Sequence, residues 1–485
     1  AAVEANEVWL AALPTEVTRH SPGEFAADST QARVDATVEA VMRIAETVAQ
    51  DDAHLAAIGP ACLRDAPDAG CVAGFVRDFA PRVLRRPLSD EEVAFYVESF
   101  EADEGITDER QRVEVLLATL LTSPEFTHHV PVVQDGRLDR YALAARLSFS
   151  VTGAGPDDAL MSAAGAGELD SVEGRETHAR RLLEVPAGRR FVRDLFERWL
   201  GMHGEASPEK AADAAGVGAD GLYDELRTEA LDFVEHVVFT GGSFETLMTS
   251  QLVFPKTERL AEIFGTERSD GPVETTGRRA GLLTRPAVLI SDNPRSSPIL
   301  RGLFIWDRFF CHTFTLPEDV NVDEIAEANL AAIEDPNQVT ARERTEIATG
   351  SPECAACHDS INPPGFALAH FGALGEEWGD FEIVHAEDET LQVPLEGDAN
   401  VSLALNGANV ALDGAGAMAD FIAGSEQGQL CAARQVFRST HLRSAFDTDT
   451  CHLRDLFEAV QSGAPILDVL VMNAASETPR VTTER

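Results

Sequence analysis

Residues 351–372, SPECAACHDSINPPGFALAHFG, decide how the rest of the chain is interpreted. They contain Cys354, Cys357 and His358 in the order Cys-x-x-Cys-His. Two thiols at this spacing can bond the two vinyl groups on one edge of a porphyrin, and the adjacent imidazole then lies under the iron. The stretch therefore predicts one covalent c-type haem, with Cys354 and Cys357 as attachment sites and His358 as the proximal ligand.

Other sites use the same residue types in different surroundings. A redox dithiol follows a strand of a βαβ unit, whereas residues 343–353, ERTEIATGSPE, have the pattern of a helix and a loop. A structural zinc site needs two more ligands at short spacing, and Cys451 with His452 lacks the usual paired form. Both interpretations stay open beside haem attachment.

The residues after the motif are suited to hold a porphyrin. Pro363, Pro364 and Gly365 predict a tight turn. A backbone carbonyl in that turn is expected to accept the Nδ1 hydrogen of His358, which leaves Nε2 for iron. Phe366 is expected to cover a porphyrin face, although apolar side chains of this kind more often pack in an ordinary core.

Residues far from the motif are expected to complete the site. Arg301 or Arg295, with Trp378, is a candidate to meet the haem propionates, because a planar guanidinium suits carboxylates. Met418 is a candidate sixth ligand, whose thioether would raise the reduction potential. The other possibilities for the sixth position are an open iron or one of three histidines, His312, His370 and His385.

The charge of the chain limits its partners. It has 485 residues, of which 82 are acidic and 39 basic, for a formal net charge of -43. This excess of acid argues against nucleic acid as a partner, because phosphates bind basic surfaces. We expect no membrane span, because no apolar run of about 18 residues occurs. An unknown redox partner protein is expected, and the chain can form oligomers.

Seven cysteines suggest an oxidising compartment. Cys62 and Cys71 flank a short loop and predict one disulfide, and Cys431 with Cys451 predicts a second, which leaves Cys311 over. Disulfides and covalent haem both point to the periplasm or the cell exterior. The chain opens with AAVEANEVWLAALP, which lacks a basic and apolar leader, so a signal peptide is expected to have been removed.

Apolar residues at helical spacing predict a mainly α protein of several packed helical subdomains. Ser89 with Glu92 is a capping box that opens a helix at 90–102, and 381–412 predicts a small β-hairpin or ribbon. The expected parts are an N-terminal helical segment (1–60), a helical subdomain with Cys62 and Cys71 (61–135), a helical bundle (136–270), a haem c-binding module (271–400) and a C-terminal helical subdomain packed on it (401–485).

Five segments in order resemble the planctomycete-type cytochrome c-like proteins, in which small domains of unknown function follow one another. They are RDFAPRVLRRPLSDEEVAFY (77–96), RYALAARLSFSVTGAGPDDAL (140–160), LVFPKTERLAEIFG (252–265), GLLTRPAVLISDNPRSSPILRGLFIWDRFFC (281–311) and CAACHDSINPPGFALAHFGALGEEW (354–378). The resemblance covers about 60–480, and the extra cysteines are similar to those of myxobacterial members. It implies haem attachment at Cys354 and Cys357 and ligation by His358. It does not imply a function.

Three functions compete at this point. The first is an extracytoplasmic monohaem protein in electron transfer, in which the protein tunes the haem. The second is a haem-dependent oxidoreductase of the peroxidase or oxidase kind, in which the helical part forms a substrate pocket over an open iron. The third is a surface assembly or binding protein that carries a haem. The state of the sixth iron position discriminates between the first two.

Overall fold

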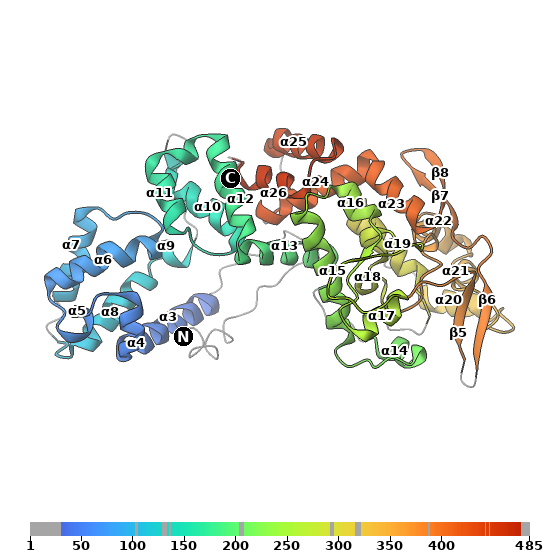
Figure 1. Cartoon of the computed structure of the whole chain (residues 1–485), viewed down its shortest axis with the longest axis horizontal. Coiled ribbons are helices and arrows are strands. Elements are labelled where there is room, and N and C mark those ends of the chain that lie inside the picture. The colour runs from blue at the N-terminus through green and yellow to red at the C-terminus, as the bar shows by residue number, and fades with distance from the viewer. Residues whose placement is uncertain are drawn as a thin grey trace. The chain divides into compact units, whose positions relative to one another are not determined.

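The structure is a computed structural model of the whole chain. It describes residues 31–101, 105–128, 133–134, 137–202, 208–291, 295–315, 322–386, 389–441, 443–445 and 447–476. These residues are mainly helical with a few short antiparallel strand pairs, which confirms the prediction of a mainly α protein with a small β element. They form two compact units (Figure 1). Among them, no helix is both long and apolar enough to cross a bilayer.

The first unit covers the chain up to Gly188 and takes in two short segments near the C-terminus. Its elements in chain order are α3 (Gln31–Gln50), α4 (Asp52–Ile58), α5 (Cys62–Asp65), α6 (Ala69–Leu84), α7 (Asp90–Glu101), α8 (Glu109–Leu121), α9 (Pro124–Thr127), β1 (Val133–Gln134), β2 (Arg137–Leu138), α10 (Arg140–Thr152), α11 (Asp158–Ala166), η1 (Glu168–Asp170) and α12 (Val172–Glu184).

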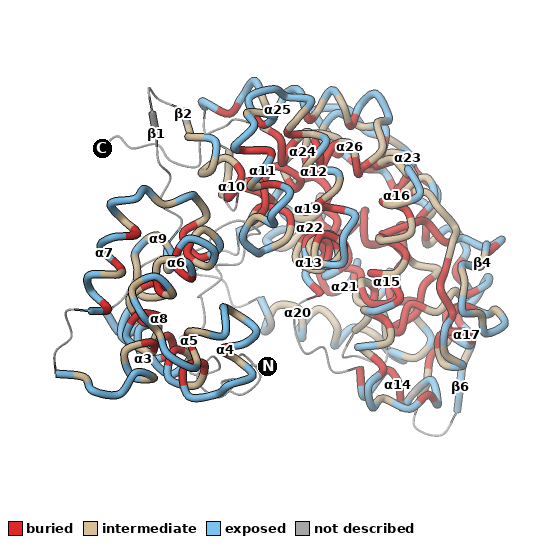
Figure 2. Tube along the Cα trace, turned by 60° about the vertical axis from the view of Figure 1, so that its left-hand side comes forward, coloured by how far each residue is buried: buried red, intermediate tan, exposed pale blue. Residues whose placement is uncertain are grey.

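One apolar core joins α3 to α8 within this unit. The buried face of α3 packs against α8. Phe75 of α6 and Val113 of α8 lie in the same buried cluster and are 0% exposed. Figure 2 shows the buried parts of these helices turned inward and their exposed parts outward. Each fully buried large apolar side chain contributes about 1.5–3 kcal/mol, so tertiary packing holds these short helices together.

The predicted capping box opens α7. The backbone N–H of Glu92 donates to the Ser89 hydroxyl at 3.2 Å, and the N–H of Ser89 donates to the Glu92 carboxylate at 2.8 Å. Arg86 also donates to Glu92, at 2.7 and 3.0 Å. These hydrogen bonds, first of all those from Arg86, lower the pKa of Glu92 to about 2. The carboxylate is thus a fixed part of the start of α7.

The second unit contains most of the remaining chain. Its elements are α13 (Pro186–Trp199), α14 (Glu209–Ala215), α15 (Leu222–Phe239), α16 (Phe244–Thr249), β3 (Leu252–Val253), α17 (Glu258–Phe264), β4 (Val273–Glu274), η2 (Gly281–Thr284), α18 (Pro286–Leu289), α19 (Pro298–Phe309), α20 (Val322–Leu330), α21 (Ala341–Ala348), α22 (Pro352–Phe366), β5 (Phe381–His385), β6 (Thr390–Pro394), β7 (Asn400–Leu405), β8 (Ala408–Asp413), α23 (Gly414–Gly424), α24 (Glu426–His441), η3 (Asp447–Asp449), α25 (Thr450–Gln461) and α26 (Ile466–Ala474).

Helices α19 and α22 pack against each other at unusually close range. A Cβ placed on Gly302 of α19 would lie 1.9 Å from the carbonyl oxygen of Ile361 in α22. A Cβ on Gly365 of α22 would lie 1.9 Å from the carbonyl oxygen of Pro298 in α19. Both glycines are therefore required by the contact itself, because any side chain would push the helices apart. The helix that carries the Cys-x-x-Cys-His motif is thereby fixed on α19.

Two antiparallel hairpins follow α22 and confirm the predicted β element. In the first, Phe381 pairs with Pro394 and His385 with Thr390. In the second, β7 and β8 pair from Asn400 with Asp413 inward, and β7 packs against α22. The second hairpin thus lies beside the motif helix.

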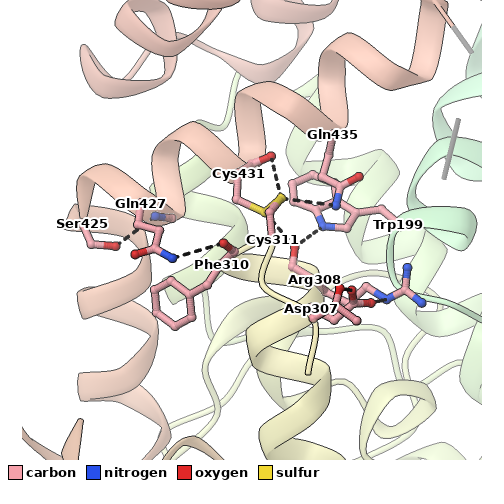
Figure 3. Close-up of a disulfide and its surroundings, with 11 residues drawn as sticks. Trp199, Asp307, Arg308, Phe310, Cys311, Ser425, Gln427, Cys431 and Gln435 are labelled. Carbon is pink, nitrogen blue, oxygen red and sulfur yellow. Dashed lines mark hydrogen bonds and ion pairs between the residues drawn. A yellow bond between two sulfur atoms is a disulfide. The ribbon is translucent and has the colours of Figure 1, made fainter. Parts of the chain in front are cut away.

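One of the two predicted disulfides is confirmed, and the other is wrong. Cys62 is bonded to Cys71 as expected, but Cys431 is bonded to Cys311, not to Cys451 (Figure 3). The reason is the way α24 packs on the end of α19, where Gln427 donates to the carbonyl oxygen of Phe310 at 3.4 Å. That contact brings buried Cys431 against Cys311, while Cys451 is a free, exposed thiol of α25.

Candidate functional site

The three motif residues lie on α22. Cys354, Cys357 and His358 occupy positions i, i+3 and i+4, which fall on one side of an α-helix. Both cysteines are free thiols, Cys354 half-buried and Cys357 exposed. The helix begins after Ser351 with Pro352 in its first turn, a position where the missing N–H costs nothing. The chain therefore presents two free thiols and one imidazole together.

A side-chain amide accepts the hydrogen bond that was expected to go to a backbone carbonyl. Nδ1 of His358 lies 2.9 Å from Oδ1 of Asn362, one turn along the same helix. The prediction of a tight turn at Pro363–Gly365 is wrong, because α22 continues to Phe366. Asn362 is 5% exposed, and its Nδ2 donates to the hydroxyl of Thr349 at 3.0 Å. His358 is thus held from one side by a buried polar pair.

The prolines are accommodated because their missing hydrogen bonds are replaced or exposed. Inside a helix, proline leaves the carbonyl four residues earlier without its usual donor. For Pro364 that carbonyl belongs to Ser360, and the indole N–H of Trp306 in α19 donates to it at 2.8 Å. For Pro363 it belongs to Asp359, a residue that borders an open hollow. Pro364 itself is buried and does not line that hollow.

The hollow has a volume of about 340 Å³ and lies between α21, α22 and the second hairpin. His358, Asn362 and Phe366 border it from α22. Its other lining residues are Arg342, Glu346, Thr349, Gly350, Ala355, Asp359, Pro363, Val401 and Ser402. The site thus combines an imidazole, one guanidinium, two carboxylates and a lining that is partly polar and partly apolar.

Phe366, the residue expected to cover a porphyrin face, borders this hollow. It is buried, and the guanidinium carbon of Arg342 lies 4.8 Å from the centre of its ring. Arg342 is also anchored by the carbonyls of Asp398 and Asn400, each at 2.8 Å. Arg342 was not foreseen from the sequence. From the sequence, Arg342 lies four residues before Glu346 on an amphipathic helix, a spacing that predicts only an ion pair on the helix surface.

Arg301 does not occupy the expected position. It is buried, and its guanidinium donates to the carbonyl oxygens of Phe371 at 2.7 Å and Gly372 at 2.5 Å. Burial lowers its pKa to about 10, although Glu376 and Glu382 act in the opposite direction. It is absent from the lining of the hollow. Arg301 therefore holds the loop after α22, and the structure does not favour it as a propionate ligand.

The other two candidates for the propionates are also engaged elsewhere. Arg295 donates to the Glu382 carboxylate at 2.6 Å and to the carbonyl oxygen of Val339 at 2.7 Å. Trp378 is buried behind the loop that Arg301 holds, and neither residue lines the hollow. The charged side chains that line the hollow are therefore those of Arg342, Glu346 and Asp359.

The candidate sixth ligands do not line the hollow. Met418 is 0% exposed on α23, which packs against α16. His312 is exposed and packs edge-on against Trp306 and Phe314. His370 lies 2.8 Å from the carbonyl oxygen of Gly379 through Nδ1, and His385 lies on the first hairpin. The structure does not bring any of these four residues to the hollow beside His358.

The residues present fit a covalently attached haem. The attachment chemistry needs two free thiols and an imidazole with one free ring nitrogen; α22 provides these, and the imidazole borders a hollow whose lining is partly polar and partly apolar. Within the described part of the chain, no group of three or more His, Cys, Asp or Glu residues could hold a metal ion. The zinc alternative therefore gains no ligand set there.

Three sequence models of protein families match the chain, and each is described as a protein of unknown function. The model DUF1595 (PSD5) matches residues 71–130, DUF1592 (PSD4) matches 138–266, and DUF1588 (PSCyt3) matches 279–379. The last of these includes all of α19, α21 and α22. Comparisons with curated proteins and with solved structures find no match.

Proposed function

Because the chain belongs to the planctomycete cytochrome c-like family, whose three domains follow one another in it, we propose that it carries one covalent haem and transfers electrons. The observation that carries this proposal is the arrangement on α22, where two free thiols lie on the same helix as an oriented imidazole that borders a hollow. The two disulfides support a location outside the cytoplasm, where thiols are oxidised.

The two cysteines of α22 and three residues that border the hollow have roles in this proposal. Cys354 and Cys357 form thioether bonds, and His358 binds iron through Nε2. Phe366 excludes water from one side, and the positive charge of Arg342 offsets carboxylates at the site. A bound haem supplies the iron that accepts and releases one electron.

The test is expression of the full chain in a host that matures c-type cytochromes, followed by denaturation in alkaline pyridine. The wild-type chain is expected to give the reduced haemochrome spectrum of two thioether links. Cys354→Ala and Cys357→Ala should each shift the band toward that of one remaining link, and the double variant should retain no covalent haem. Cys451→Ala is the matched control, since this free thiol lies on α25 and should leave the spectrum unchanged.

A wild-type chain without covalent haem, from a host shown to mature another c-type cytochrome in parallel, would refute the proposal. Equal amounts of covalent haem in the double variant and the wild type would also refute the proposal.

One observation favours a second function, that of a haem-dependent oxidoreductase. Among the residues that line the hollow, His358 alone carries an imidazole and none carries a thioether. This favours an iron with an open position, where a small oxidant can bind. A low-spin native spectrum, which requires two strong axial ligands, would favour electron transfer. A high-spin spectrum would favour the oxidoreductase.

A further inference from the structure

The ring of His358 is connected to α21 through two buried side chains. Nδ1 of His358 faces Oδ1 of Asn362 at 2.9 Å, and Nδ2 of Asn362 donates to Oγ1 of Thr349 at 3.0 Å. The hydroxyl of Thr349 in turn donates to the carbonyl oxygen of Thr345 at 2.8 Å. We propose that Asn362, oriented by Thr349, is a positioning residue that keeps the proton of neutral His358 on Nδ1 and leaves the Nε2 lone pair for the metal.

The direction of each hydrogen bond follows from the last acceptor in the chain. A carbonyl oxygen can only accept, so the single hydroxyl proton of Thr349 points to Thr345. The hydroxyl oxygen then accepts from Asn362, and only the NH₂ group of an amide can donate. The amide oxygen must therefore face His358. Because that oxygen can only accept, Nδ1 of His358 carries the proton.

Burial makes this orientation costly to reverse. Asn362, Thr349 and Thr345 are 5%, 8% and 7% exposed, so water has little access to them. Turning the amide over would place two acceptors, the amide oxygen and the carbonyl oxygen of Thr345, against the single hydroxyl proton of Thr349, so one hydrogen bond worth about 0.5–1.5 kcal/mol would be lost. Thr349 is also fixed as the residue that ends α21, where its N–H is bonded within the helix. The imidazole is thus oriented by a neighbouring helix as well as by its own.

The chemical type of the acceptor matters as much as its position. An amide is neutral, so it accepts from the Nδ1 hydrogen without drawing the proton strongly toward itself. A carboxylate at the same place would make the imidazole a stronger electron donor and stabilise the more oxidised metal. The inference rests on the proposed function in naming a metal, but the position of the proton is a property of the chain alone.

The first test measures the tautomer in the full chain labelled with ¹⁵N-histidine and expressed without haem maturation. Long-range ¹H–¹⁵N spectra assign the proton of His358, with His358→Gln used to identify its signals. We expect Nδ1–H in the wild type. We expect a shift toward Nε2–H in Asn362→Leu and in Thr349→Val, and recovery of the wild-type pattern in Thr349→Ser, which restores the hydroxyl.

The second test measures the reduction potential of the haem-loaded chain. Asn362→Asp is expected to lower it, whereas Asn409→Asp should leave it close to wild type. Asn409 is an exposed residue of β8, so its replacement controls for the added charge. Thr349→Ser serves again as the conservative variant that keeps the wild-type potential.

The outcomes separate this inference from the proposed function. Wild-type His358 protonated on Nε2, or Thr349→Val with an unchanged tautomer and potential, would overturn the inference even if haem is attached. Covalent haem missing from the mature chain, together with an Nδ1–H tautomer that depends on Thr349, would refute the proposed function and retain the role of Asn362. If Asn362→Leu fails to fold, the Thr349 variants and Asn362→Asp still test whether Asn362 positions the proton of His358.

Discussion

The indole N–H of Trp306 donates to the carbonyl oxygen of Ser360 at 2.8 Å, and this oxygen is the one that Pro364 leaves without a helical donor. A side chain of α19 thus replaces a backbone hydrogen bond of α22. Trp306→Phe should remove the donor and strand a buried acceptor, which costs about 1–3 kcal/mol. Amide hydrogen exchange over 352–366 should become faster in this variant.

Pro364→Ala provides the matched background for that experiment, because alanine restores a helical donor to Ser360. In Pro364→Ala, the added effect of Trp306→Phe on exchange should be smaller than in the wild type. Equal effects in both backgrounds would show that Trp306 acts through packing alone.

Gly302→Ala should destabilise the second unit. The new Cβ would lie 1.9 Å from the carbonyl oxygen of Ile361, so α19 and α22 must separate. Overpacking of this kind costs about 1–3 kcal/mol, and calorimetry should show a lower melting temperature. Gly416→Ala is the control, since a Cβ there meets nothing within 4 Å on helix α23. An equal loss in both variants would contradict the steric explanation.

Removal of the bond between Cys311 and Cys431 should lower stability more than removal of the free thiol. Cys431→Ala opens a loop of 120 residues, and loss of a native disulfide costs about 2–5 kcal/mol. The melting temperature should fall in Cys431→Ala and stay unchanged in Cys451→Ala. Mass spectrometry of unreduced peptides should join Cys311 to Cys431. A peptide that joins Cys431 to Cys451 would contradict the structure.

The capping box at Ser89 and Glu92 predicts a pH-dependent contribution to α7. The pKa of Glu92 lies at about 2 in the folded chain, below its ordinary value of 4.5, mainly because Arg86 donates to it. The carboxylate therefore stabilises the fold fully above pH 4.5, and this contribution is lost as pH falls through 2. At pH 7, Glu92→Gln should speed exchange of the first α7 amides, by an amount equivalent to about 1 kcal/mol.

The effect of Glu92→Gln should shrink as pH falls below 4.5 and disappear near 2, with each variant compared with wild type at the same pH. Glu91→Gln removes the same charge from the same helical turn, but Glu91 is exposed and should change exchange little. A difference that persists undiminished at pH 2 would show that the carboxylate charge is not the cause.

The acidic surface should influence electron exchange if the proposed function is correct. A net charge of -43 attracts cations and repels anions. At low salt, cationic cobalt complexes should therefore oxidise the reduced chain faster than ferricyanide of comparable driving force, by about tenfold or more. Added salt should reduce the difference because it screens the charges. Faster reaction with the anion at low salt would contradict a role of the surface in steering.

The features that the sequence predicted correctly are those that depend on near neighbours. Ser89 and Glu92 are three residues apart, and Cys62 and Cys71 are separated by 9 positions with a short loop between them. Alternating apolar residues likewise located the β element at 381–412, which the structure divides into two hairpins. Each of these signals is local, so it survives without knowledge of tertiary packing.

The errors arose where distant packing overrides a local signal. Cys311 pairs with Cys431 because α24 lies on the end of α19, 120 positions away in sequence. The Pro363–Gly365 stretch was interpreted as a turn, but Trp306 supplies one of the missing donors and the helix continues. The sequence did contain a signal for the acceptor of His358, because Asn362 lies four residues later and so on the same face of a helix.

The bond between Cys311 and Cys431 closes a covalent ring that contains all of α20, α21 and α22. A protease that cuts the backbone once inside this ring would leave both fragments joined, so the cut chain would run as one band until a reductant is added. Wherever such a cut falls, the segment with Cys354, Cys357 and His358 would remain covalently joined to the rest of the chain. In an oxidising compartment, the site can thus outlast damage to the chain that surrounds it.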